Sequence, residues 1–163
     1  GGPSRVSASA ASRGGVVRAM ALAAIAVFLL DRVSKVVVID VLDLPHHGIM
    51  PVASPYLTFI MAWNTGINFG LFGDADARWL LVALALGVSV GVGWWMLRRG
   101  DARLAWAGGV LIGGAVGNAW ERVQYGAVAD FLNMSCCGIQ NPYAFNVADV
   151  AIFAGAVWLA WKA

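Results

Sequence analysis

Charged residues are scarce in this sequence. Asp, Glu, Lys and Arg make up 12% of the 163 residues, about half the ~25% share of an ordinary soluble domain. The net charge of +2 is too small to indicate nucleic-acid binding. Because the mean hydropathy is +0.74, the apolar surplus belongs in lipid, and the length allows one compact bundle with no second domain.

Cysteine and histidine are also rare, and neither type has the spacing of a metal site. His46 and His47 are adjacent, as are Cys136 and Cys137. Neighbouring side chains rarely point at one ion, and no third ligand is obvious, so we expect no metal and no cofactor. We expect the two cysteines to be free thiols packed at the membrane interface. Both histidines lie far from any serine motif typical of a Ser-His-Asp hydrolase.

Long uncharged runs predict an all-α membrane protein with four transmembrane helices, at about residues 16–41, 79–97, 104–120 and 145–161. The first run could be misread as a secretory signal, but Asp31 and Arg32 follow it where a cleavage site would stand, which favours a retained helix. The preceding residues 1–15 are expected to be a disordered tail. Their opening Gly-Gly-Pro-Ser lacks a methionine and is set aside as a cloning remnant.

Basic residues predict the orientation. They concentrate in the N-terminal tail, in the loop after the second run and at the C-terminus, which places both termini in the cytoplasm and both longer loops outside. The outer segment at about residues 45–75 contains a stretch rich in β-formers and aromatics, 56–63, followed by a turn at 64–66. We expect a small extracytoplasmic β-rich segment between the first and second helices, resting on the membrane surface.

Glycines recur every fourth residue in two of the predicted spans. They occupy positions 109, 113 and 117 in the third span and positions 87 and 91 in the second. This spacing places small residues on one helix stripe, where two backbones can approach closely. Bundle packing is the preferred interpretation of both stripes.

Polar residues gather at one membrane depth. Asp31 lies about 22 Å along the first span, Asn118 lies about 21 Å along the third, and Asp149 lies about one turn below the outer edge of the fourth. A charged side chain inside the bilayer costs ~2.5–3.5 kcal/mol by insertion scales and therefore indicates function. The residues near this level also share helix faces: Asp31 with Lys35, Asn118 with Glu121 and Arg122, and Asn146 with Asp149.

Each polar group also has a simpler explanation. The Asp31–Lys35 pair could be an ion pair at a helix end, the Glu121–Arg122 pair a terminal anchor, and Asn146 a helix N-cap. Asp149 has no such simpler explanation, because an acid one turn inside an apolar helix needs a partner. One site is more economical than several unrelated features at one depth. An ion carrier is disfavoured, since its polar residues would be spread across the membrane.

Four blocks resemble those of the lipoprotein signal peptidases (signal peptidase II) of proteobacteria. They are residues 31–35 (DRVSK), 64–70 (NTGINFG), 117–131 (GNAWERVQYGAVADF) and 145–149 (FNVAD). The third and fourth blocks are specific, and the four together extend over about residues 16–161. Two positions depart from the family pattern: Glu121 stands where an Asp is usual, and Asn68 where a small residue is frequent.

The resemblance implies an aspartic endopeptidase of the bacterial inner membrane. It would cut diacylglyceryl-modified prolipoproteins before the lipidated cysteine, near the periplasmic face, as a monomer surrounded by lipid. By resemblance the catalytic pair is Asp130 and Asp149. The carried-over substrate-binding residues are Asn64, Gly66, Asn118, Arg122 and Asn146, and the residues of structural support are Asp31, Lys35 and Glu121.

Two carboxylates within hydrogen-bond reach share one proton, so one can activate water while the other protonates the scissile carbonyl oxygen. Because such a pair titrates jointly, neither role is assigned to one residue; the helix N-terminus beside Asp149 favours its charged form and inclines it towards the base. Residues 64–72 are placed to close over the substrate. The alternative function is that of a catalytically inactive relative, which would bind lipopeptides or assist membrane-protein assembly.

Overall fold

A computed structural model describes residues 5–66 and 77–163. Within these ranges the chain forms five α-helices, one π-helical turn and one sheet. In chain order the elements are α1 (Arg5–Val36), the π-turn η1 (Val37–Val41), α2 (Leu44–His47), β1 (Ile49–Ala53), β2 (Leu57–Asn64), α3 (Arg78–Arg99), α4 (Ala102–Tyr125), β3 (Val128–Met134) and α5 (Val147–Lys162).

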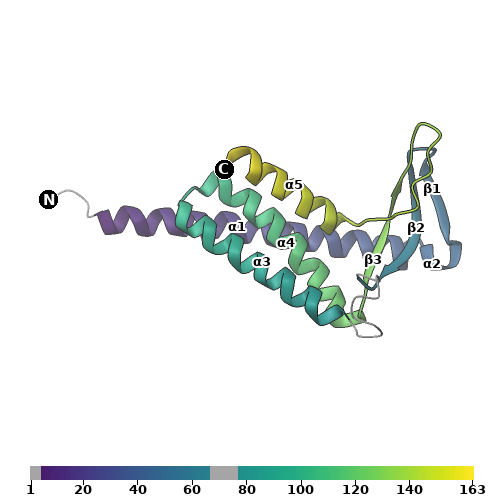
Figure 1. Ribbon diagram of the computed structural model, residues 1–163, viewed down its shortest axis with the longest axis horizontal. Helices are drawn as coiled ribbons and strands as arrows, with labels where there is room; N and C mark the ends of the chain where they lie inside the picture. The colour runs from purple at the N-terminus through teal and green to yellow at the C-terminus, as the bar shows by residue number, and fades with distance from the viewer. Residues whose placement is uncertain (1–4, 67–76) are drawn as a thin grey trace.

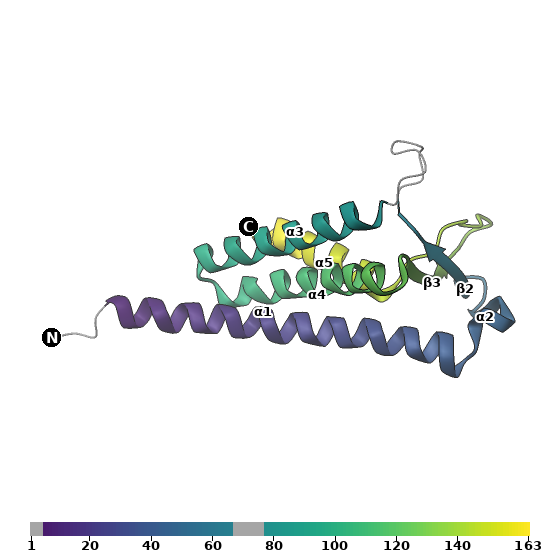
Figure 2. The ribbon, with the colours of Figure 1, turned by 90° about the horizontal axis from the view of Figure 1, so that it is seen from below.

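Helix α4 is the centre of the bundle. It packs against α1, α3 and α5, whereas contacts of α1 with α3 and α5 are few. Figure 1 shows α3, α4 and α5 inclined across the long helix α1, and Figure 2 shows them running along it, with the sheet beyond one end of the bundle and the C-terminus at the other. The loops that connect helices to the sheet therefore meet at one end.

Glycines allow α4 to approach two of its neighbours closely. A Cβ atom added at Gly109 or Gly113 would lie 2.5 or 2.6 Å from a backbone oxygen of α1, and one added at Gly114 would lie 2.5 Å from the Ala148 oxygen of α5. Real Cβ atoms do not approach so closely. The stripe in α4 thus packs as expected. The prediction of bundle packing was wrong for Gly87 and Gly91. Helix α3 turns this face away from the bundle, and a Cβ atom added at either glycine would have no neighbouring atom within 4 Å.

Replacing Gly114 by alanine is expected to destabilise the protein by roughly 1–3 kcal/mol, since the new methyl group forces α5 away from α4. The replacement Gly91→Ala is the matched control, because it adds the same methyl group to a helix interior where no atom is near. It should leave stability unchanged or raise it slightly. Thermal unfolding in detergent measures both. Equal melting temperatures would contradict the packing described for α4 and α5.

The sheet is antiparallel in the order β1-β2-β3. The sequence indicated strand structure only between the first two long helices, and it gave no sign of β3, which follows α4 and carries Asp130. In the sheet, Asp130 pairs with Ala62, and Val128 pairs with Asn64. The strand therefore holds Asp130 near the end of β2 where Asn64 lies.

A small apolar cluster fixes the sheet to the end of α1. Phe131 is 2% exposed and packs with Val38 and Leu44. Its ring also meets that of Phe59 edge to face, with the centroids 5.5 Å apart. Since Phe131 directly follows Asp130 and strand side chains alternate in direction, burying the ring turns the neighbouring carboxylate toward the opposite face.

The helices begin and end close to the predicted spans, with two differences. Helix α1 starts at Arg5, ahead of the expected start at residue 16, and α4 extends to Tyr125, where Gly126 with a φ of 75° ends it. Among the described residues, α3 alone is long and apolar enough to cross a membrane by length and composition. The other three predicted spans stay a prediction; α1 contains internal charges, and α5 has 16 residues.

Candidate active site

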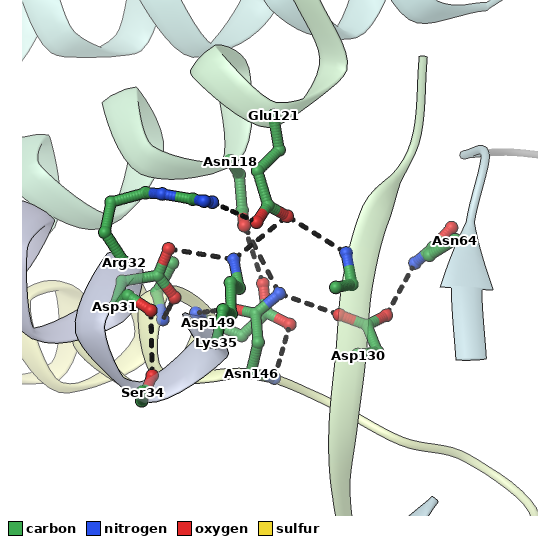
Figure 3. Close-up of polar contacts among 12 residues, drawn as sticks. Asp31, Arg32, Ser34, Lys35, Asn64, Asn118, Glu121, Asp130, Asn146 and Asp149 are labelled. Atoms are coloured by element: carbon green, nitrogen blue, oxygen red, sulfur yellow. Dashed lines mark hydrogen bonds and ion pairs between the residues drawn. The ribbon is translucent and has the colours of Figure 1, made fainter. Parts of the chain in front are cut away.

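Asp130 lies on β3 with its carboxylate turned into the gap between the sheet and the helices (Figure 3). The residue is 4% exposed. Its Oδ1 accepts a hydrogen bond of 2.7 Å from Asn146 Nδ2, and its Oδ2 accepts one of 3.2 Å from Asn64 Nδ2. Two amide side chains from different elements therefore hold one buried carboxylate.

Asp149 lies in the first turn of α5 and takes part in the N-terminal cap of that helix. The backbone N–H of Asp149 donates to Asn146 Oδ1 over 2.9 Å, and the Asn146 N–H donates back to Asp149 Oδ2 over 3.3 Å. This reciprocal pair is a capping box. The remaining oxygen, Oδ1, accepts from Asn118 Nδ2 over 2.8 Å. Asn118 thus connects α4 to the acid.

Asn146 joins the two acids. Its Nδ2 donates to Asp130, while its backbone N–H and Oδ1 hold Asp149. The same Nδ2 lies 3.3 Å from Asn118 Oδ1. The N-cap explanation for Asn146 is therefore confirmed, and it does not compete with a place in the site. One fully buried side chain caps α5 and sets the two carboxylates around it.

The environment of Asp130 favours its protonated form. Burial, together with the negative charge of Asp149, raises the pKa of Asp130 to about 6 from an ordinary value of 3.8. The hydrogen bonds from Asn64 and Asn146 act in the opposite direction, because they stabilise the carboxylate. Asp130 can therefore hold a proton near neutral pH, when an ordinary aspartate cannot.

A buried ionic cluster lies beside the two acids. Lys35 Nζ is 2.8 Å from Asp31 Oδ2 and 3.0 Å from Glu121 Oε2, and all three residues are at most 1% exposed. Arg32 Nη1 donates to the other oxygen of Glu121. The sequence missed this role of Arg32, because it suggested only the neighbouring Arg122 as a partner of Glu121.

The acids of this cluster hold the backbone directly in front of each site aspartate. Asp31 Oδ1 accepts the N–H of Ala148 over 2.9 Å, and Glu121 Oε2 accepts the N–H of Ala129 over 2.9 Å. Ala148 precedes Asp149, and Ala129 precedes Asp130. The contacts are drawn in Figure 3. Lys35 neutralises both of these acids, so one cation supports the placement of both site carboxylates.

The remaining predicted site residues have different surroundings. Gly66, with a φ of 110°, donates its N–H to Asn64 Oδ1 over 2.9 Å, which directs the Asn64 amide nitrogen toward Asp130. Arg122 is partly buried, and its Nε has no hydrogen-bond partner among the described residues. Asn68, and the part of the predicted closing segment after residue 66, lie outside the described residues.

The histidines and cysteines lie outside this site. His46 Nδ1 is 2.6 Å from Asp43 Oδ1, and this hydrogen bond raises the pKa of His46. His47 Nδ1 contacts the Asp43 carbonyl oxygen over 2.9 Å. Cys136 and Cys137 are free and exposed. Hence none of the four contributes to the arrangement around Asn146.

Comparison with known proteins gives matches along most of the chain. The family model described as signal peptidase (SPase) II matches residues 23–163. A lipoprotein signal peptidase of Methylobacterium sp. (strain 4-46) is 40% identical over 83% of this chain and 82% of its own length. The corresponding protein of Nitrobacter hamburgensis is 40% identical over 88% and 90%. That of Methylorubrum extorquens is 46% identical, and the match spans 65% of this chain and 63% of the relative.

Two solved structures, each described as a bacterial membrane enzyme, share the fold. One superposes with a TM-score of 0.72 over 87% of this chain and 85% of its own, at 21% identity. The other gives a TM-score of 0.74 over 87% and 90%, at 20% identity. At such identities the likeness concerns the fold alone. It places the central helix, its three neighbours and the small sheet in an architecture already seen in membrane enzymes.

Proposed function

The chain belongs to the signal peptidase (SPase) II family, and from that premise we propose that it removes signal peptides from diacylglyceryl-modified prolipoproteins by aspartic catalysis. Asp130 and Asp149 are the catalytic pair of this proposal. The observation that carries it is the double attachment of Asn146, which bonds both carboxylates at the bundle end where the sheet begins.

Two acids around one buried amide can divide the work of peptide hydrolysis. The ionised acid takes a proton from a water molecule as the water oxygen attacks the scissile carbonyl carbon. The protonated acid gives its proton to the carbonyl oxygen, and the departing amine is later protonated by the pair. General acid–base catalysis of this kind contributes ~10²–10⁴-fold each. Neither step calls on any group outside this chain, the peptide and water.

In this proposal Asp130 carries the resting proton and Asp149 is the base. Asp130 is buried in the sheet with a raised pKa. Asp149 stands at the N3 position of α5, where the partial positive charge of the helix end stabilises a carboxylate.

Exposed apolar side chains support placement of the bundle in a membrane. Ile25 on α1, Val90 on α3 and Phe153 on α5 are 58%, 72% and 72% exposed. A soluble monomer rarely presents large apolar surface on several helices at once. Lipid around a four-helix transmembrane bundle would cover this exposed apolar surface. With both termini cytoplasmic, as the basic residues favour, the two acids lie toward the outer face.

The pH dependence of cleavage should reflect Asp130. Above pH 6 the free enzyme loses the proton from Asp130, so kcat/KM is expected to fall as pH rises through this value. Replacing Asn64 by alanine removes a hydrogen bond that stabilises the carboxylate. A hydrogen bond worth ~1 kcal/mol corresponds to ~0.7 of a pKa unit. Its loss should therefore raise the pKa of Asp130 and move the falling limb of the kcat/KM profile to higher pH by about that amount.

The matched control for this shift is Gln140→Ala, which removes an exposed amide outside the site. Its profile of kcat/KM against pH should coincide with that of the unchanged protein. If the falling limb of the kcat/KM profile moves to lower pH in Asn64→Ala, the role given to the hydrogen bond from Asn64 to Asp130 is contradicted.

A cleavage assay tests the proposed function. Purified protein is mixed with one prolipoprotein in two forms, with and without the diacylglyceryl group on the cysteine, and precursor loss is followed by gel mobility. Cleavage of the lipidated form before the cysteine is the expected result.

No finding favours the alternative function of a catalytically inactive relative. Glu121, the departure from the family pattern that prompted this alternative, keeps bonds to Lys35, Arg32 and the Ala129 N–H.

A further inference from the structure

A polar cavity opens beside the ionic cluster, between the end of α1, the end of α4 and strand β2. Its volume is about 220 Å³, enough for roughly seven water molecules at ~30 Å³ each. Charged and aromatic side chains form most of its wall, namely Arg32, Lys35, Asp40, Trp63, Glu121 and Tyr125.

Two side chains of opposite charge in this wall, Arg32 and Asp40, have hydrogen-bonding capacity left. Lys35 and Glu121 are engaged with each other and with Asp31, Arg32 and Ala129. Arg32 uses Nη1 for Glu121 and stacks its guanidinium carbon 4.4 Å above the Trp120 ring. A guanidinium group has five N–H donors, so others are left for a ligand. Asp40 is exposed and forms no ion pair or hydrogen bond within the described parts of the chain.

The positions of these groups suit a ligand with both charges. Asp40 follows Arg32 by eight residues on the continuous helix of α1 and η1, a rise of ~12 Å. Both side chains line the same cavity. The same wall contains two aromatic rings, those of Trp63 and Tyr125, whose centroids lie 6.2 Å apart. An acid beside aromatic faces is a binding environment for an ammonium group.

A second, apolar cavity continues along the same face of α1. It has a volume of about 290 Å³ and is lined by Ala24, Ile25, Phe28, Leu29, Gly113 and Val116. Positions 25, 28, 32 and 36 of α1 follow one another at intervals of three or four residues and hence share a helix face. Trp120 contacts one lining residue of each cavity, because its ring meets Phe28 edge to face and lies under Arg32. From Ala24 to Val36 the rise is ~18 Å.

The face of α4 that bears Trp120 is not the one that contacts Asp149. Trp120 stands two residues from both Asn118 and Arg122, and residues two apart on a helix point in directions ~200° apart. Asn118 bonds Asp149. A molecule in the two cavities would therefore lie across α4 from the scissile peptide.

We propose that the two cavities form a seat for one phospholipid with a zwitterionic ethanolamine-type headgroup. The phosphate lies on Arg32, the ammonium lies between Asp40 and the rings of Trp63 and Tyr125, and one acyl chain follows the apolar cavity. An anionic headgroup fits less well, because it has no cation to place beside Asp40. The proposal uses the placement of the bundle in lipid but not the catalytic role of the two aspartates.

Native mass spectrometry of the purified full chain in detergent tests the seat. Phosphatidylethanolamine and phosphatidylglycerol with identical acyl chains are added in equal amounts. The unchanged protein should retain one lipid, with the ethanolamine lipid preferred about tenfold. Asp40→Asn should lose this preference. The matched control is Asp43→Asn, at an exposed position outside the cavity where a positive φ of 55° suits asparagine.

A second pair of variants tests occupancy without altering charge. Val36 lines the polar cavity, and Val37 beside it does not; both are exposed, at 45% and 41%. Val36→Trp should fill the cavity and abolish the retained adduct, whereas Val37→Trp should keep it. Asp149→Asn should also keep it, which separates this test from that of the peptidase. Equal retention in Val36→Trp and Val37→Trp, or no preference for the ethanolamine lipid, would overturn the proposal.

Discussion

Replacing Asp149 by asparagine is expected to reduce the rate of signal-peptide removal by at least about a thousandfold. An amide oxygen cannot take a proton from water as a carboxylate does, so the reaction loses its base. Asparagine at this position can still accept the Asn146 N–H, and the cap of α5 survives. The loss should therefore appear in kcat, measured as precursor consumption at saturating lipidated prolipoprotein, with little change in melting temperature.

Asp43→Asn is the matched control for this loss. Asp43 is an exposed acid whose carboxylate contacts His46 rather than the residues around Asn146. The same chemical change there should leave the rate unaltered. A rate for Asp149→Asn within tenfold of that for Asp43→Asn would remove Asp149 from the catalytic pair.

Replacing Lys35 by methionine is expected to have the largest effect on stability. Lys35 is the buried cation between Asp31 and Glu121. Its loss takes from Asp31 the cation with which it pairs and leaves Glu121 paired with Arg32. Breaking a buried ion pair by removing one partner costs ~3–5 kcal/mol, because a charge is left uncompensated. Thermal unfolding in detergent measures this cost.

Lys162→Met provides the matched change at an exposed position near the C-terminus. It should leave the melting temperature within the error of the measurement. Because Asp31 and Glu121 also hold the N–H groups before Asp149 and Asp130, Lys35→Met should lower activity even at temperatures where it stays folded. A Lys35→Met protein as stable and active as Lys162→Met would show that the cluster supports neither the fold nor the site.

The sequence predicts the helices because long apolar runs have few other solutions in a chain so poor in charge. It also predicts that polar residues from three helices meet, since the helical rise places Asp31, Asn118 and Asp149 at one depth. Helix spacing alone suggests the Asp31–Lys35 pair, which the structure confirms at 2.8 Å. These features follow from periodicities within one element.

The features that the sequence misses depend on partners distant in the chain. Strand β3 is short and forms against β2, and no local pattern in residues 128–134 points to that pairing. Glu121 bonds Arg32 from 89 positions away rather than its neighbour Arg122. Local spacing suggested either a cap or a site for Asn146, but only the placement of Asp130 by β3 reveals that one side chain does both.

The longer acid at position 121 has a structural explanation. Glu121 reaches Arg32 and Lys35 on α1 and the Ala129 N–H in front of β3 at the same time. Its side chain spans the distance from α4 to these partners without leaving a buried oxygen unbonded. The departure from the usual family residue is therefore accommodated at this position, and it leaves the contacts of Asp130 and Asp149 intact.

A crystal structure with a transition-state mimic, in which a hydroxyl replaces the scissile carbonyl oxygen, tests the central claim most directly. We expect this hydroxyl to lie between Asp130 and Asp149, within ~2.6–3.2 Å of an oxygen of each, with Asn146 still bonded to both acids. Carboxyl groups separated by well over ~10 Å, or a mimic bound away from them, would contradict it, because acids that share a proton lie ~3 Å apart.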